Sequence, residues 1–144
     1  MDSSRAEPRE TGSGIAFIDT NVFVYAVGRA HPLRERAQTL LRERKAQRAP
    51  LATSAEVLQE LLHVYLPVGR LTTLDAALRL ALDLTTVWPV DEQDVQAARD
   101  LAVVRPGLGA RDLLHLAMCR RHGAREILSF DRALLAAFRT GRRA

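Results

Sequence analysis

The chain has 144 residues, 47% of them hydrophobic, a formal net charge of +4 and a sequence pI near 10.2. This length and apolar content fit one domain with its own core, and no apolar run approaches the roughly 18 residues of a membrane span. The single cysteine, Cys119, excludes an intrachain disulfide and favours a reducing, cytoplasmic compartment.

The predicted elements alternate between short apolar segments and amphipathic helices. Residues 1–14 lack periodicity and any signal-peptide core, so we expect a flexible N-terminal arm. The first half is expected to contain, in order, a strand over 15–19, a helix over 20–27, a helix from Pro32, a strand over 50–54 and a helix over 55–66 capped by Ser54.

The second half continues the same pattern. Thr72 and Asp75 have the spacing of a capping box. The expected elements are a helix over 76–84, a strand over 86–90, a helix over 92–104 capped by Asp91, a helix over 110–122 ending at Gly123, a strand over 126–130 and a helix over 132–138. Residues 140–144 form a basic tail, so the single domain spans 15–139. Strands alternating with helices predict an α/β fold, with a central parallel sheet of about four strands flanked by about seven helices.

Acidic residues follow or accompany these strands. Asp19 and Asp131 lie at the carboxyl ends of the first and fourth strands, and in open parallel sheets that end of the strands is where ligands bind. Asp112 is in the first turn of its helix, and Glu60 borders the apolar face of another. Each acid also has a simpler interpretation: Asp19 and Asp131 as helix caps, Asp112 as a dipole partner, Glu60 as a solvated residue.

The four acids together indicate a metal site. Clustered carboxylates repel one another, and a divalent cation removes that conflict. Oxygen ligands suit Mg²⁺ or Mn²⁺, and the sequence has no Cys/His cluster with zinc spacing.

Four segments carry a family resemblance: "FIDTNVFVYA", "TSAEVLQELLHV", "GARDLLHLAMCRRHG" and "ILSFDRAL". They resemble the acidic blocks of a PIN domain, over about Ile15 to Phe138, and the compact size resembles the VapC-type toxins of toxin–antitoxin pairs. The resemblance implies a three-layer fold and a Mg²⁺- or Mn²⁺-dependent endoribonuclease with one or two ions. It also implies a cognate antitoxin and a homodimer.

The resemblance also assigns roles to individual residues. Asp19, Glu60, Asp112 and Asp131 match the catalytic acids, with Asp19, Asp112 and Asp131 as metal ligands and Glu60 as ligand or base. The supporting polar positions are Thr20, Asn21 and Ser129. Glu56 is the second choice for the glutamate, and Asp94 is a reserve for the third acid.

Substrate contacts are assigned to basic residues, because a basic protein favours nucleic acid among possible partners. Arg111, Arg120 and Arg121 are the candidates, against the alternative of an ordinary solvated face. His115, one turn after Asp112, is interpreted as a packed, hydrogen-bonded residue, against the alternative that it assists phosphate contact or orients a neighbouring acid. Cys119 and Trp88 are interpreted as core.

Two other functions remain open. A PIN-like module that binds RNA or protein without cleavage would keep the same acids. A phospho-receiver would also cluster acids at strand ends, but it needs a lysine near the last strand, and the single lysine, Lys45, lies in an early helix.

Overall fold

A computed structural model describes residues 14–143, so the predicted arm over residues 1–13 lies outside the described part of the chain. Short parallel strands form the centre of the fold: β1 (Ala16–Ile18), β2 (Leu51–Ser54), β3 (Thr86–Trp88) and β4 (Glu126–Leu128). They make one sheet in the order β3-β2-β1-β4. The predicted parallel sheet of four strands is confirmed.

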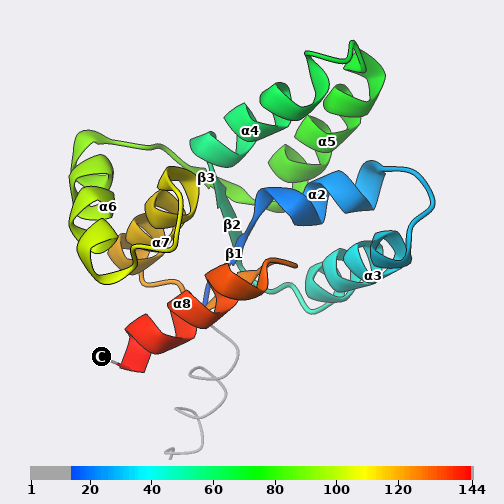
Figure 1. The fold of residues 1–144 in the computed structure, drawn as a ribbon. Coiled ribbons are helices and arrows are strands. Elements are labelled where there is room, and N and C mark those ends of the chain that lie inside the picture. The colour runs from blue at the N-terminus through cyan, green and yellow to red at the C-terminus, as the bar shows by residue number, and fades with distance from the viewer. Residues whose placement is uncertain (1–13, 144) are drawn as a thin grey trace, which may run out of the picture.

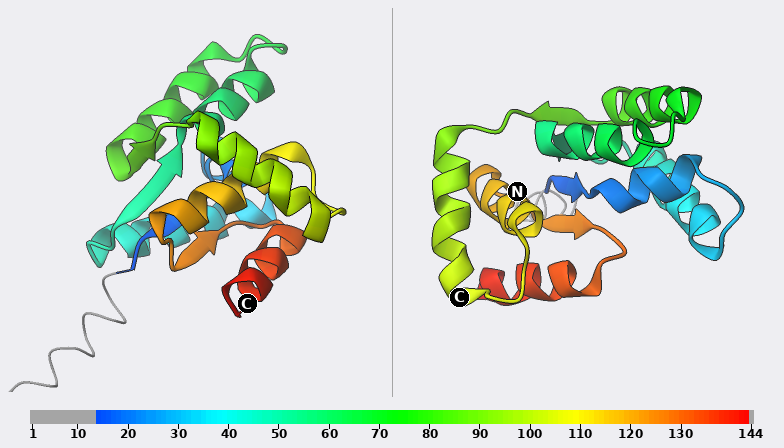
Figure 2. Two further views of the ribbon diagram at one scale, coloured as in Figure 1. Left: turned by 90° about the vertical axis from the view of Figure 1, so that its left-hand side faces the viewer. Right: turned by 45° about the horizontal axis from the view of Figure 1, so that its top comes forward.

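Seven helices in the described part of the chain cover the sheet: α2 (Thr20–Val27), α3 (Pro32–Ala46), α4 (Ala55–Tyr65), α5 (Leu71–Leu84), α6 (Glu92–Val104), α7 (Ala110–His122) and α8 (Arg132–Arg143). Helices α6 and α7 lie on one side of the sheet, and α2 to α5 lie on the other (Figure 1). Figure 2 shows α4 and α5 as an antiparallel pair, and α6 packed along α7. None of these described helices has the length and apolar character to cross a membrane.

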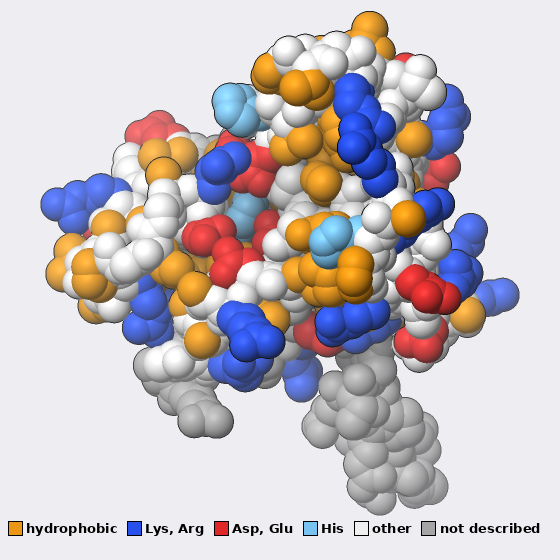
Figure 3. Space-filling model, turned by 45° about the vertical axis from the view of Figure 1, so that its right-hand side comes forward, with side chains coloured by type: hydrophobic (Ala, Val, Ile, Leu, Met, Phe, Trp, Pro, Cys, Tyr) orange, Lys and Arg blue, Asp and Glu red, His pale blue; other side chains and the backbone are white. Residues whose placement is uncertain are grey.

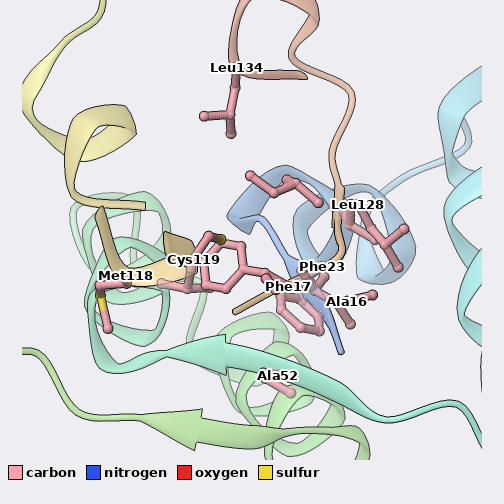
Figure 4. Packing of buried hydrophobic residues seen from close by; sticks show 14 of the residues in the cluster. Ala16, Phe17, Phe23, Ala52, Met118, Cys119, Leu128 and Leu134 are labelled. Carbon is pink, nitrogen blue, oxygen red and sulfur yellow. The ribbon is translucent and has the colours of Figure 1, made fainter. Parts of the chain in front are cut away.

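The core explains why β1 is central. All three of its residues are buried, and Phe17 and Ile18 have no exposed surface. Phe17 stacks on Trp88 with ring centroids 5.7 Å apart. Figure 4 shows Phe17 among core residues from the sheet and from α7, including Met118 and Cys119. Burying such a side chain stabilises the fold by about 1.5–3 kcal/mol. The predicted core positions of Trp88 and Cys119 are confirmed.

Hydrogen bonds and a backbone angle confirm several predicted helix boundaries. The Ser54 hydroxyl accepts a hydrogen bond from the Val57 backbone N–H at 3.1 Å. Asp91 and Asp94 form a reciprocal capping box at the start of α6. Gly123 ends α7 in the left-handed conformation, with φ of 68°, which glycine adopts without strain.

Two boundary predictions were wrong. Helix α5 begins at Leu71 with no side-chain cap, because Gly69, at φ of 69°, closes the turn and places Thr72 already inside the helix. Helix α8 continues to Arg143, beyond the predicted end at Phe138, so most of the predicted tail is helical. Phe138 is buried and the Thr140 hydroxyl donates to the Ala136 carbonyl at 2.8 Å, which continues the helix past that point.

Candidate active site

The four predicted acids line one cavity of about 630 Å³: Asp19, Glu60, Asp112 and Asp131. The cavity lies at the carboxyl ends of β1 and β4, because parallel neighbours end at the same edge of the sheet. In Figure 3 acidic side chains gather in a hollow beside a histidine and arginines. Residues more than 100 positions apart in the chain therefore meet at one place.

Asp19 follows β1 directly and is only 6% exposed. One carboxylate oxygen, Oδ1, accepts from the Thr20 backbone N–H at 2.8 Å, and the other, Oδ2, accepts from the Ser129 hydroxyl at 2.7 Å. Asp19 is thus both the cap of α2 and a member of the acidic cluster. The two bonds fix the orientation of the carboxylate.

Glu60 reaches inward from α4 and is 5% exposed. Its Oε1 accepts a hydrogen bond from the Thr20 hydroxyl. Its Oε2 is buried and has no hydrogen-bond partner among the described residues. Burial raises the pKa of Glu60, but interactions with His115, Thr20 and Arg111 outweigh it and lower the pKa overall. The Oε1 of Glu60 is therefore hydrogen-bonded, while its Oε2 faces His115 and Arg111, 3.6 Å from each.

The prediction for His115 was right about its packing and wrong about its hydrogen bonding. The residue is packed, at 1% exposed, but Nδ1 has no hydrogen-bond partner among the described residues, and Nε2 lies 3.6 Å from both Asp19 Oδ1 and Glu60 Oε2. Burial lowers its pKa, and the surrounding carboxylates Glu60, Asp19 and Asp112 reverse this and raise it. Its position three residues after Asp112, one turn along α7, was the signal that could have placed it in the site.

Asp112 and Asp131 face each other across the cavity from α7 and from the start of α8. Burial raises the pKa of Asp112, and the charges of Asp131, Asp19 and Glu60 raise it further. Asp131 Oδ1 accepts from the backbone N–H groups of Ala133 at 2.9 Å and Leu134 at 3.1 Å. Asp131 therefore caps α8 while contributing charge to the cavity.

Asn21 and Ser129 connect the two strand ends. The Asn21 side-chain amide donates to the Ser129 hydroxyl at 3.3 Å, and its oxygen accepts from the Phe130 backbone N–H at 3.2 Å. Ser129 in turn accepts from the Asp131 backbone N–H at 2.9 Å. This network holds the loop after β4 against α2 and fixes the distance between Asp19 and Asp131.

The three candidate arginines separate into two groups. Arg111 lines the cavity, with Nε 3.6 Å from Glu60 Oε2 and a side chain 60% exposed. Arg121 lies toward the other end of α7 and binds Asp94 with two hydrogen bonds of 2.6 and 2.9 Å. Arg120 lines a separate cavity of about 310 Å³ with Cys119 and Phe138. Of these three arginines, only Arg111 lies beside the four acids of the cavity.

The two alternative acids lie outside the cavity. Glu56, one turn before Glu60, is half-buried, and burial followed by the Glu60 charge raises its pKa. Asp94 is engaged with Arg121 on the far side of α7. Lys45 lies on α3 beside a different cavity, so the described residues offer the acids no lysine of the kind a phospho-receiver needs.

The donor set fits a metal ion. One ligand atom each from Asp19, Glu60 and His115 lies within 4.8 Å of the others. A cation in the cavity would give the Glu60 oxygen that lacks a hydrogen bond a partner. It would also offset the repulsion from neighbouring acids that raises the pKa of Asp112. Carboxylate oxygens favour hard divalent ions, and the imidazole adds a nitrogen that Mn²⁺ tolerates.

The chain matches the PIN domain family over residues 16–138. It is 56% identical over 124 residues to Ribonuclease VapC23 of Mycobacterium tuberculosis, covering 86% of this chain and 98% of that protein. Ribonuclease VapC13 of the same species is 36% identical over 116 residues, covering 80% of this chain and 88% of that protein.

Two solved structures share the fold. The crystal structure of Mycobacterium tuberculosis VapC20, a sarcin-ricin loop cleaving toxin, superposes with a TM-score of 0.70 at 21% identity, covering 85% of this chain and 94% of that one. VapBC2 from Rickettsia felis, bound to a DNA fragment from its promoter, gives a TM-score of 0.62 at 19% identity, covering 81% and 87%. At these identities the likeness concerns architecture alone.

Proposed function

We propose that this chain, which belongs to the PIN domain family and within it to the VapC group, is a metal-dependent endoribonuclease acting as the toxin of a toxin–antitoxin pair. The observation that carries the proposal is the convergence of Asp19, Glu60, Asp112 and Asp131 on one cavity. Helix capping accounts for Asp19 and Asp131 but not for Glu60, which is buried inside α4. Its Oε2 has no hydrogen-bond partner among the described residues and lies 3.6 Å from His115 Nε2 and from Arg111 Nε.

In this proposal Asp19, Asp112 and Asp131 would hold Mg²⁺ or Mn²⁺, as one ion or two. The bound ion would neutralise charge on a phosphoryl oxygen and lower the pKa of a water toward neutrality. Glu60, whose Oε2 accepts no hydrogen bond from the described residues, would either contribute a ligand or accept a proton from the attacking water. The products of water attack are a 5′-phosphate and a 3′-hydroxyl.

The remaining side chains position the acids and the substrate. Thr20 donates to Glu60 through its hydroxyl and to Asp19 through its backbone, so one residue orients both carboxylates. His115 lies between the same two carboxylates and reduces their repulsion. Arg111, exposed at the rim, reaches a phosphate next to the scissile bond and offsets the negative charge that would repel RNA.

The biological setting is inferred from relatives. VapC23 and VapC13 are named ribonucleases, VapC20 is titled as a toxin, and the Rickettsia felis structure holds a VapBC pair. We propose that this chain likewise pairs with a cognate antitoxin, forms a homodimer and acts on RNA in the cytoplasm.

The experiment is cleavage of a structured RNA with Mg²⁺ or Mn²⁺ and then with a chelator. Asp19→Asn should abolish cleavage while the circular-dichroism spectrum is kept, because the amide keeps the size and one acceptor of the carboxylate but not its charge. Asp75→Asn on α5, an exposed acid away from the cavity, is the matched control and should cleave normally. Full cleavage by Asp19→Asn, or cleavage in chelator, would refute the metal site. RNA binding without cleavage by the unmodified chain would favour a non-catalytic module instead.

A further inference from the structure

Two aromatic side chains lie outside the core. The chain has four phenylalanines, two tyrosines and one tryptophan, of which the buried ones are Phe17, Phe23, Tyr65, Trp88 and Phe138. The other two, Tyr25 on α2 and Phe130 after β4, are half-buried. Their rings contact each other edge to face, with centroids 5.6 Å apart and planes at 85°.

This pair forms a ridge at the edge of the acidic cavity. Tyr25 lines that cavity. Phe130 lines a neighbouring hollow of about 480 Å³ together with Arg36, and Phe130 is also the residue directly before Asp131. An RNA chain bound with a phosphate at the acids would extend past Tyr25, which lines the same cavity, and toward Phe130, which contacts Tyr25.

The ridge is held rigidly. The Tyr25 ring lies 4.9 Å from the exposed His31 ring, and His31 is fixed because its Nδ1 accepts from the Leu33 backbone N–H at 3.0 Å. The Phe130 backbone is fixed by its bond to Asn21. The Arg36 guanidinium lies over the Phe130 ring, 5.5 Å from its centroid. Rigid aromatic surfaces bind with a small loss of conformational entropy.

The charges around the ridge favour a base over a phosphate. Glu35 and Glu43 line the same hollow as Arg36, so the hollow carries both signs and does not select for a phosphate. Aromatic faces, in contrast, accept any nucleobase by stacking, and an arginine beside them adds a cation–π contribution.

We infer that Tyr25 and Phe130, with Arg36, form a stacking site for a nucleobase of single-stranded RNA beside the phosphate bound at the acids. This inference rests on the proposed function, since the acids must act on RNA. The site tolerates all four bases, and it requires the nucleotide next to the cut to be unpaired and splayed from its neighbours.

The test measures binding of a fluorescent single-stranded RNA of about 12 nucleotides by anisotropy, in an Asp19→Asn background that prevents cleavage. Tyr25→Leu and Phe130→Leu keep apolar volume but remove the π face, and each should weaken binding roughly 5- to 100-fold, the range that loss of one stacked base gives. Tyr25→Phe and Phe130→Tyr keep a ring and should restore binding. Leu82→Ala, an exposed apolar position on α5, is the control and should bind as the parent does.

An RNA series with an abasic nucleotide moved along the strand provides a measurement that does not depend on the folding of a variant. One abasic position should weaken binding to the parent and have little effect in the leucine variants. Binding within twofold for both leucine variants, or an abasic series without any sensitive position, overturns the stacking site. Cleavage of the same RNA by the unmodified chain separates failure of the stacking site from failure of the proposed nuclease function. If the unmodified chain cleaves the RNA and the leucine variants bind it normally, only the stacking site is refuted. If the unmodified chain neither cleaves nor binds the RNA, the nuclease function is refuted as well.

Discussion

Thr53 provides a sharp test of how the fold positions the site. Its side chain is fully buried, and its hydroxyl donates to the Ile18 carbonyl at 2.8 Å. The backbone pairing of β1 with β2 ends before this point, at Phe17 and Ala52. The hydroxyl therefore continues the attachment of β1 up to the residue directly before Asp19. We expect Thr53→Val to weaken both stability and metal binding.

The magnitude follows from two opposing contributions. Leaving a buried carbonyl without this donor costs about 1–3 kcal/mol, and the added methyl group returns up to about 0.8 kcal/mol of apolar burial. With the full methyl contribution, the net loss of unfolding free energy is about 0.2–2.2 kcal/mol, or a fall in melting temperature of up to roughly 7 °C for a chain of this size. Thermal unfolding in chelator measures this loss, and a Mn²⁺ titration of the same samples measures the effect on the site.

Thr53→Ser is the matched control. It keeps the hydroxyl and removes a buried methyl group, so it should lose about 1 kcal/mol of stability while its Mn²⁺ affinity stays close to that of the unmodified chain. Equal stability of Thr53→Val and the unmodified chain would show that the hydrogen bond is not needed. An equal loss of Mn²⁺ affinity in both variants would show that packing alone, and not the hydroxyl, positions Asp19.

Two further predictions concern groups outside the cavity. Burial raises the pKa of Asp94, but its bonds to Arg121 and to the Asp91 backbone outweigh this effect and lower the pKa. The charge of Asp94 therefore stabilises the fold above about pH 4, and this contribution is lost as the pH falls through the lowered pKa. Asp94→Asn should therefore melt at a lower temperature than the unmodified chain near pH 7, and this difference in melting temperature should narrow below pH 4. The variant should keep its RNA cleavage. A difference in melting temperature that is independent of pH would contradict the ion pair. Burial also raises the pKa of the Cys119 thiol, so a thiol-reactive dye should label the chain only in denaturant, and rapid labelling of the native protein would show that this part of α7 opens.

Local sequence patterns predicted the elements well because their causes are local. Ser54, Asp91 and Gly123 act through hydrogen bonds or backbone angles within a few residues, so their roles can be inferred from neighbours in the chain. The capping box at Thr72 failed although its spacing was right, since Gly69 in the preceding turn set where the helix begins. The C-terminal helix was predicted to end at Phe138 because the residues directly after it, RTGRR, show no apolar periodicity, whereas the helix continues to Arg143.

The four acids could be chosen from sequence because each stands at a strand end, in the first turn of a helix or on the inner border of a helix. Sequence could not determine the neighbours of these acids. Helix α7, which carries Asp112, also places His115 between Asp19 and Glu60 and Arg121 against Asp94. The sequence does not show which of these two basic residues lies near the acids of the cavity.

The sequence by itself determined the order of strands and helices along the chain, and it predicted the single domain and the four acids, because periodicity, caps and charge are properties of short segments. The tertiary structure alone decided that His115 enters the site, that Arg111 reaches it while Arg120 and Arg121 do not, and that Tyr25 meets Phe130 at its edge. These outcomes depend on how strands separated by most of the chain pair in one sheet. A contact between distant segments is a property of their packing and is not encoded in either segment alone.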